Sequence, residues 1–168
     1  MILEIVRDQD PESPRDWDNL GTFYMTHRRY AFGDAKAKNI DINTFQGIFL
    51  PVYMYDHSGI TVSTTPFSCP WDSGQIGWIY ASVEKVKKDF GWKRLTKKRR
   101  DEIKSILDGE IKVLDQYLQG DIYGFNLIGG EGDVLDSCWG FYGDDPKTNG
   151  MAEHLNQLLD TLEIRRAA

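Results

Sequence analysis

Apolar residues recur at helical spacing through the third quarter of the chain, and this pattern constrains the fold more than any other feature. The steps between them are four, four, three and four residues, so all of them fall on one face of a helix. Thr96 is a typical N-cap before this helix, and Gly120 is typical of the residue that ends one. A helix with such a face needs a core to pack against. The residues of the stripe are Ile103, Leu107, Ile111, Leu114 and Leu118.

Two pairs of β-like segments flank turn-forming residues, and they predict two antiparallel hairpins. Residues 49–55 and 60–64 flank a tetrapeptide that ends in glycine, which allows a positive φ. Residues 122–128 and 134–141 flank a second, glycine-rich turn. Pro51 lies inside the first segment and indicates an edge strand or the start of a strand.

The remaining segments complete a chain of short strands with the helices late in the sequence. Strands paired mainly through hairpins are typical of the α+β class. We therefore expect an α+β fold, an antiparallel β-sheet built from hairpins with two amphipathic helices packed on it, in a single domain over residues 1–168. The other expected elements are strands at 2–6, 22–27 and 77–81, a helical turn after Ser13, loops over 32–43 and 66–77, a short helix from Ser82 to Phe90 ended by Gly91, and a last helix carrying Met151, Leu155, Leu158 and Leu162.

Length and composition exclude several classes of protein. The 168 residues are enough to bury a core, and no repeat or low-complexity spacer divides them. Two cysteines are too few for a disulfide-stapled scaffold. The longest apolar run, Gly47–Met54, is far shorter than the roughly 20 residues that span a bilayer. The first residues lack the basic and apolar regions of a secretory signal. We therefore expect a cytoplasmic protein without a membrane partner.

Charge is distributed unevenly along the chain. The 20 basic and 26 acidic residues give a net charge of −6, which disfavours general DNA binding. Yet Glu84–Lys104 holds ten basic and four acidic residues, whereas the other 147 residues hold ten and 22. Either the basic segment contacts phosphate groups, or the acidic remainder occupies a basic groove of another protein. The structural alternative is a solvated helix face whose charges compensate one another.

One set of residues is a candidate for nucleophilic catalysis. Cys69 lies in a predicted loop with Asp72, about a dozen residues after His57. A thiolate paired with an imidazole that a carboxylate orients makes a nucleophile. The simpler interpretation is that His57 is an exposed turn residue and Cys69 a small buried side chain.

No spacing typical of a metal site occurs, and we expect neither a metal nor a cofactor. Asp136 and Cys138 lie two residues apart on a predicted strand, so they share one face and form half of a possible site. Cys138 beside Trp139 is more typical of a core. The glycines at 129–132 precede a strand and not a helix, which argues against a phosphate cradle.

Aromatic and arginine side chains are frequent in the predicted loops. These residue types concentrate in the parts of interfaces that contribute most to binding, although rings packed over a thin core are the structural alternative. A nucleic-acid-binding protein would instead use the basic segment 85–104 on phosphates, through Lys93, Arg94, Lys97, Lys98, Arg99 and Arg100. The residues expected to contact a protein partner are Trp17, Arg28, Arg29, Tyr30, His57, Trp71 and Asp72.

Several motifs along most of the chain together resemble an uncharacterised family of small hypothetical proteins that bacteriophages and related mobile elements carry. The motifs are residues 11–22, the segment His27–Tyr30 with Gly33-Asp34, and the segments Tyr55–Ile60, Ser68–Gln75 and Asp136–Gly143. The resemblance brings no established activity, so it assigns no catalytic residue. It implies a small accessory protein in the cytoplasm of an infected bacterium, where such acidic proteins often inhibit host defences.

Three function classes therefore remain open. The favoured hypothesis is a non-enzymatic inhibitor of a host defence system, of the anti-CRISPR or anti-restriction type, which binds a host protein or nucleoprotein complex through an acidic and aromatic surface. The second is a nucleic-acid-binding protein, and the third is a cysteine-dependent hydrolase or transferase. Of the three, only the last requires the Cys69 thiol.

Overall fold

The structure is a computed structural model of the chain and describes residues 1–36, 46–155 and 158–166. It confirms the α+β class, with mixed sheets and helices in one chain. The chain forms two compact units, which are described separately below. Unit 1 consists of Met1–Ser13 and Gln116–Ala168, and unit 2 of Pro14–Asp115. That residues 1–168 form a single cooperative domain stays a prediction.

Unit 1 contains a four-stranded sheet whose strands are ordered β8-β7-β1-β9. The β7–β8 pair is the second predicted hairpin, and it is confirmed as antiparallel. β1 pairs antiparallel with β7 and parallel with β9, so the sheet is mixed. The elements are β1 (Ile2–Arg7), β7 (Ile122–Ile128), β8 (Val134–Tyr142), α3 (Met151–His154), the 3-10 turn η3 (Leu158–Thr161) and β9 (Glu163–Arg166).

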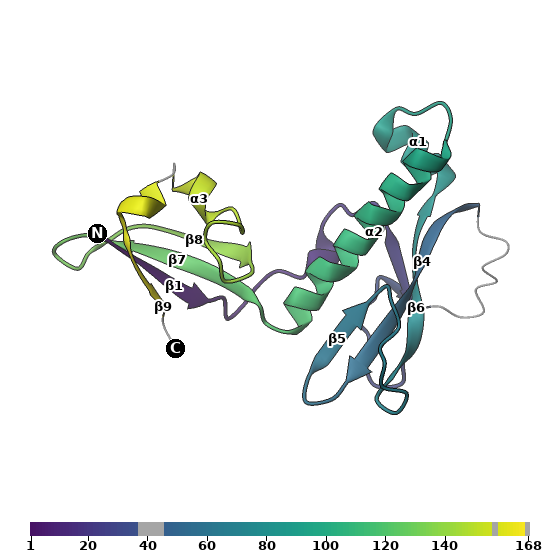
Figure 1. The fold of residues 1–168 in the computed structure, drawn as a ribbon, viewed down its shortest axis with the longest axis horizontal. Helices are drawn as coiled ribbons and strands as arrows, with labels where there is room; N and C mark the ends of the chain where they lie inside the picture. Colours follow the sequence, from purple (N-terminus) through teal and green to yellow (C-terminus); the bar gives the residue numbers. More distant parts are fainter. Residues whose placement is uncertain (37–45, 156–157, 167–168) are drawn as a thin grey trace. The chain divides into compact units, whose positions relative to one another are not determined.

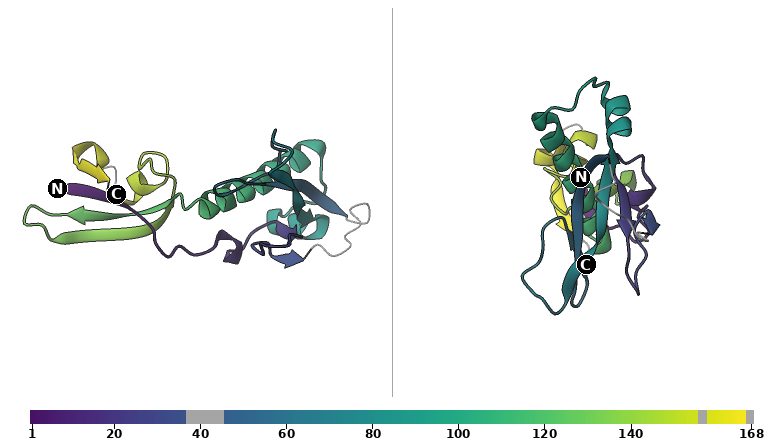
Figure 2. Two further views of the ribbon diagram at one scale, coloured as in Figure 1. Left: turned by 90° about the horizontal axis from the view of Figure 1, so that it is seen from below. Right: turned by 90° about the vertical axis from the view of Figure 1, so that its right-hand side faces the viewer.

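One face of this sheet carries the core of unit 1. Neighbouring pairs across β1 and β7, Leu3 with Leu127 and Ile5 with Phe125, point to the same side of the sheet and are buried. Met151 at the start of α3 is buried in the same cluster, so α3 lies on that side of the sheet. Figure 2 shows α3 against one face of the sheet.

The last helix is shorter than predicted. It ends at His154 and does not continue as one helix to Leu162, and the side chain of Leu158 lies outside the described residues. Met151 and Leu155, one turn apart, already cover the core cluster. The chain then pairs with β1 as β9. The sequence did not predict this strand. All four of its residues are exposed, so it lacks the alternation of apolar and polar residues that marks a half-buried strand.

Unit 2 contains a five-stranded sheet ordered β3-β2-β6-β4-β5 (Figure 1). The β4–β5 pair is the first predicted hairpin, and it is confirmed. Among the described residues, β5 pairs with residues 53–56 of β4, so at Pro51 the one strand of the described part that pairs with β4 is β6. The elements are the 3-10 turn η1 (Pro14–Asp16), β2 (Thr22–Met25), β3 (Ala35–Lys36), β4 (Gly47–Asp56), β5 (Ile60–Ser63), β6 (Ser73–Ser82), α1 (Val83–Phe90) and α2 (Lys97–Leu118). The last three residues of α2 are counted in unit 1.

Strand β6 begins earlier than predicted. Its first residues, Ser73–Gln75, were expected to belong to a loop because they are polar and contain glycine. They pair with the far end of β4, where Tyr55 faces Ser73. The expected loop over 32–43 lies partly outside the described residues, and β3 occupies two positions within it.

The two predicted helices of unit 2 are confirmed, and α1 has both of its predicted caps. The Ser82 side chain accepts a hydrogen bond from the Lys85 N–H at 3.0 Å, and Gly91 ends α1 with a φ of 65°. Four of the five stripe residues of α2 are buried, and Leu118 is half-buried.

Carboxylates of α2 fasten the helix to the sheet. Asp115 accepts a hydrogen bond from the Val62 N–H at 2.7 Å, and Asp108 accepts one from Thr64. Burial alone would raise the pKa of Asp108, but hydrogen bonds from Lys112 and Thr64 hold it below its usual value. Among the described residues, no helix is both long and apolar enough to cross a membrane.

Candidate functional site

Three loops of unit 2 meet at one end of its sheet. β4 ends at Asp56 and β6 begins at Ser73, and the Asp56 N–H donates to the Asp72 carbonyl at 2.9 Å. On the other side of β6, the Thr26 N–H donates to the Ile76 carbonyl at 2.8 Å. The loops after β2, after β4 and before β6 therefore lie side by side. We call this surface the loop face, and we define it by His27–Tyr30, Asp56-His57 and Trp71-Asp72.

The loop face contains two adjoining recesses. One, of about 390 Å³, is lined by both arginines of the β2–β3 loop, by Asp56 and by Trp71-Asp72. The other, of about 480 Å³, follows the β2–β3 loop from Met25 to Lys36. The two share the residues His27–Arg29. Their volumes are in the range that side chains of a partner or a small ligand occupy.

Contacts within the loop face order the β2–β3 loop. Arg29 forms an ion pair with Asp56, and its guanidinium lies 5.4 Å from the centre of the Tyr30 ring. The Tyr30 hydroxyl donates to the same carboxylate at 3.2 Å. The N–H groups of Arg29 and Tyr30 lie 3.3 Å from Nδ1 of His27, so this nitrogen acts as an acceptor. A loop held in this way presents its exposed side chains at fixed positions.

Trp71 is the most exposed large apolar side chain of the loop face. Its exposed fraction is 91%, compared with 44% for Trp17. Arg28, which lines the same recess as Trp71, is also exposed. A partner surface that covered this indole would gain the free energy of burying its apolar area.

The proposed catalytic residues meet, but in the wrong order for a cysteine nucleophile. Asp72 Oδ2 lies 3.3 Å from His57 Nδ1 and 4.0 Å from Cys69 Sγ. A thiolate is activated by an adjacent imidazole that the carboxylate orients from its far side. Here the carboxylate itself lies between the sulfur and the imidazole. Within residues 1–36, 46–155 and 158–166, no cluster of three or more potential metal ligands occurs.

Six of the seven predicted contact residues lie together in the loop face, and Trp17 lies apart from it. Trp17 follows η1 and lines neither recess.

The charge of the loop face also differs from the acidic surface that was expected. Its two arginines are matched by Asp56 and Asp72, so the face is of mixed charge. Most of the negative charge belongs to unit 1, which has four basic and 13 acidic residues and a net charge of −9. Unit 2 has 16 basic and 13 acidic residues, a net charge of +3.

The basic residues of the nucleic-acid hypothesis lie at the opposite end of the unit 2 sheet. Gly47 at the start of β4 pairs with Ser82 at the end of β6, next to α1. Lys93 and Arg94 lie in the turn between α1 and α2 (Figure 1). Lys97, Lys98, Arg99 and Arg100 form the first turn of α2.

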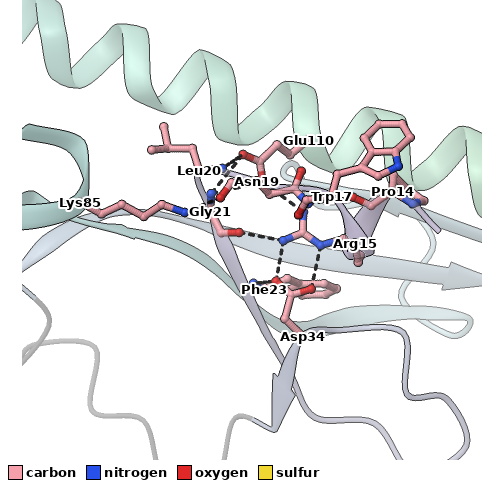
Figure 3. A network of polar contacts seen from close by, with 10 residues as sticks. All are labelled: Pro14, Arg15, Trp17, Asn19, Leu20, Gly21, Phe23, Asp34, Lys85 and Glu110. Carbon is pink, nitrogen blue, oxygen red and sulfur yellow. Dashed lines mark hydrogen bonds and ion pairs between the residues drawn. The ribbon is translucent and has the colours of Figure 1, made fainter. Parts of the chain in front are cut away.

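A polar network beside α2 supports the second recess (Figure 3). The Arg15 guanidinium donates to both oxygens of Asp34, to Glu110 at 3.0 Å and to the Gly21 carbonyl at 2.7 Å. Burial alone would lower the pKa of Arg15, but Asp34 and Glu110 raise it above its ordinary value. Asp34 also accepts a hydrogen bond from the Phe23 N–H at 2.7 Å. The network thereby holds Asp34, a lining residue of the recess, against β2.

Two residues of the loop face were not among the predicted contacts. Asp56 accepts from both Arg29 and Tyr30, and the His27 ring stacks on Tyr30 at 5.1 Å. The sequence placed Asp56 in a hairpin turn, where aspartate is frequent for local reasons. Only the pairing of β4 with β6 brings it next to the β2–β3 loop. Comparison with protein-family models, with curated proteins and with solved structures finds no match to this chain.

Proposed function

We propose that the protein acts by binding a protein partner through the loop face, without covalent chemistry. The observation that carries this proposal is Trp71, 91% exposed on the rim of a recess that Arg28 and Arg29 also line. Tryptophan, arginine and tyrosine are the residue types that dominate binding energy at protein interfaces. The loop that carries Arg28–Tyr30 is ordered by its own contacts, so little conformational freedom is lost when a partner docks.

The mixed charge of the loop face suggests how a partner is selected. Arg29 and Asp56 pair with each other, whereas Arg28 is exposed beside Trp71. A complementary surface would offer an apolar pocket for the indole and a carboxylate for Arg28. We propose a component of a host defence complex as the partner class, which is what the resemblance to phage-carried proteins implies.

The cysteine-dependent alternative is less well supported. Asp72 Oδ2 lies 4.0 Å from the Cys69 sulfur and 3.3 Å from His57 Nδ1, so the carboxylate and not the imidazole is the neighbour of the thiol. The binding proposal therefore predicts that Cys69→Ser leaves the activity of the protein intact.

Affinity purification followed by quantitative binding tests this proposal. The tagged protein is expressed in a bacterial host, co-purified proteins are identified by mass spectrometry, and the dissociation constant of each purified partner is measured. Truncation of an interface tryptophan or arginine of this kind weakens binding by about thirtyfold. We expect losses of that size for Trp71→Ala and for Arg28→Ala, and none for Cys69→Ser.

Trp17→Ala is the matched control, because it removes a partly exposed tryptophan of the same unit that lies outside the loop face. It should keep the affinity of the unmodified protein. A partner that binds Trp71→Ala and Arg28→Ala as tightly as the unmodified protein would refute the loop face as the docking surface. Loss of the effect on the host in Cys69→Ser, with binding retained, would support the enzyme instead.

A further inference from the structure

The segment that joins α1 to α2 concentrates positive charge at one corner of unit 2. From Lys87 to Arg100 the sequence contains eight basic residues and one acidic residue, a net charge of +7 over 14 positions. All but one of the basic side chains are exposed, and Arg99 is half-buried. We call this surface the basic corner. Its residues are Lys87, Lys88, Lys93, Arg94, Lys97, Lys98, Arg99 and Arg100.

The charges of the basic corner are not compensated by ion pairs. In the described part of the chain, none of its eight basic side chains lies within 4.0 Å of a carboxylate. Exposed cations elsewhere do find such partners, for example Lys112 with Asp108 at 2.7 Å and Arg165 with Glu163 at 2.9 Å. A solvated helix face with internally compensated charges, the structural alternative for this segment, therefore does not describe it.

The position of these charges on α2 is unfavourable for the folded protein alone. The first turn of α2 contains four basic and no acidic side chains. The positive end of the helix dipole lies at the same place, so each cation there is repelled. A ligand that brings several negative charges removes both the mutual repulsion of the side chains and their repulsion by the helix.

Aromatic contacts give the corner a fixed shape. The Trp92 ring lies 4.6 Å from the Phe90 ring, and the Arg99 guanidinium lies 4.7 Å from the centre of the Trp92 ring. Arg99 also donates to the Arg94 carbonyl at 2.8 Å. Because Phe90 and Arg99 both contact the Trp92 ring, it serves to hold the turn and not to stack on a base.

We propose that the basic corner binds the phosphodiester backbone of nucleic acid without regard to sequence. The four consecutive cations at the start of α2 project in steps of about 100° around the helix, so they do not share one plane. A polyphosphate chain follows such a surface and meets several of the cations at once, whereas a flat bilayer meets those of one side.

This surface is independent of the loop face. β4 and β6 run between the two with ten residues each, which separates them by about 30 Å at the usual rise of a strand. The proposal thus adds a nucleic-acid contact to a protein that docks on its partner through the other end of the same unit. Its failure would leave the loop face untouched, because the variants that test the two surfaces do not overlap.

Fluorescence anisotropy with labelled oligonucleotides of about 20 nucleotides tests the proposal in the chain of 168 residues. Single-stranded DNA, duplex DNA and single-stranded RNA are titrated at salt concentrations between about 50 and 200 mM. We expect binding in at least one arm, with an affinity that falls linearly in log–log coordinates as salt rises. The variant Lys93→Gln/Lys97→Gln/Lys98→Gln should bind at least about tenfold more weakly, and its salt slope for duplex should be smaller by about 3.

The matched control Lys36→Gln/Lys112→Gln/Lys147→Gln removes the same net charge away from the corner, and it should keep the slope and affinity of the unmodified protein. Circular dichroism verifies that both variants keep their helices. Absence of binding to all three nucleic acids at about 50 mM salt would overturn the proposal. So would an equal loss in the control variant, or binding to phosphatidylserine vesicles with no binding to nucleic acid.

Discussion

Arg15 shows how one side chain can determine the shape of a candidate site from a distance. Its side chain is only 7% exposed, and it joins Asp34 of the recess to Glu110 of α2. Glu110 in turn accepts the N–H groups of Leu20 and Gly21, at 2.9 and 3.0 Å. Charges this deeply buried cost desolvation energy, and they are tolerated because each of the three guanidinium nitrogens donates to an acceptor.

Replacing Arg15 should therefore be costly. In Arg15→Ala, Asp34 and Glu110 keep their burial but lose their shared cation, and we expect the free energy of unfolding to fall by about 3 kcal/mol. Urea denaturation followed by circular dichroism measures this loss. Arg29→Ala is the control, because the Arg29 side chain is 58% exposed in its pair with Asp56 and such a pair contributes less than about 1 kcal/mol. Equal losses in the two variants would contradict the structural role of Arg15.

The sequence predicted the location of Arg15 but not its role. Ser13-Pro14 indicated a helical turn, and η1 is found there. The partner Glu110 is 95 residues away, and nothing local distinguishes it from the other acidic residues of α2. For the same reason the sequence selected Arg29 and Tyr30 as contact residues but missed Asp56, which reaches them only through the β-sheet.

At the level of elements, α2 combines a stabilising stripe with a destabilising first turn. Ile103, Leu107, Ile111 and Leu114 are all at most 1% exposed. The cations of the first turn oppose the helix dipole, by about 0.3–1 kcal/mol each at low salt. Since packing on the sheet contributes far more than the dipole costs, the helix forms in spite of its N-terminus.

The variant Lys97→Glu/Lys98→Glu should accordingly raise stability while it weakens nucleic-acid binding. Two acidic residues in the first turn interact favourably with the dipole, and we expect a gain of about 1–2 kcal/mol in the free energy of unfolding at low salt. Urea denaturation at two salt concentrations measures the gain, which should shrink as salt rises. A variant that loses stability would show that the cations have structural partners after all.

Elements were predictable where local chemistry alone determined them. Ser82 caps the start of α1 and Gly91 caps its end, and the periodic apolar stripe identified α2. Both signals act within a few residues along the chain. β9 and the start of β6 depend instead on partners far along the chain, β1 and β4. The last helix was predicted too long because its apolar spacing fits a helix, although α3 ends at His154 and the separate 3-10 turn η3 begins at Leu158.

In the whole molecule, net charge separates according to the two compact units. Unit 1 is assembled from both ends of the chain and carries −9, whereas unit 2 is one continuous segment and carries +3. A single value of −6 for the chain hides this separation, since it averages over residues that the fold places in different units. The acidic body expected from the sequence is therefore mainly unit 1, and the candidate contact residues belong to unit 2.

The continuity of unit 2 leads to a prediction about the segment Pro14–Asp115 expressed alone. It contains its own sheet and the buried stripe of α2, so we expect a folded fragment with a cooperative thermal transition. Without the −9 of unit 1, it should bind the labelled duplex more tightly than the full chain at about 10 mM salt, where the Debye length is about 30 Å. At about 150 mM salt that length is about 8 Å, and the difference should largely vanish.

The salt dependence of duplex binding distinguishes electrostatic repulsion by unit 1 from a steric block. A fragment that binds more tightly by the same factor at both salt concentrations would indicate that unit 1 blocks the basic corner directly, because long-range repulsion between charges is screened whereas a steric block is not. Equal binding at low salt would show that the charge of unit 1 does not reach the corner. A fragment that fails to fold would show that the two units stabilise each other, which is the behaviour expected if residues 1–168 form one cooperative domain.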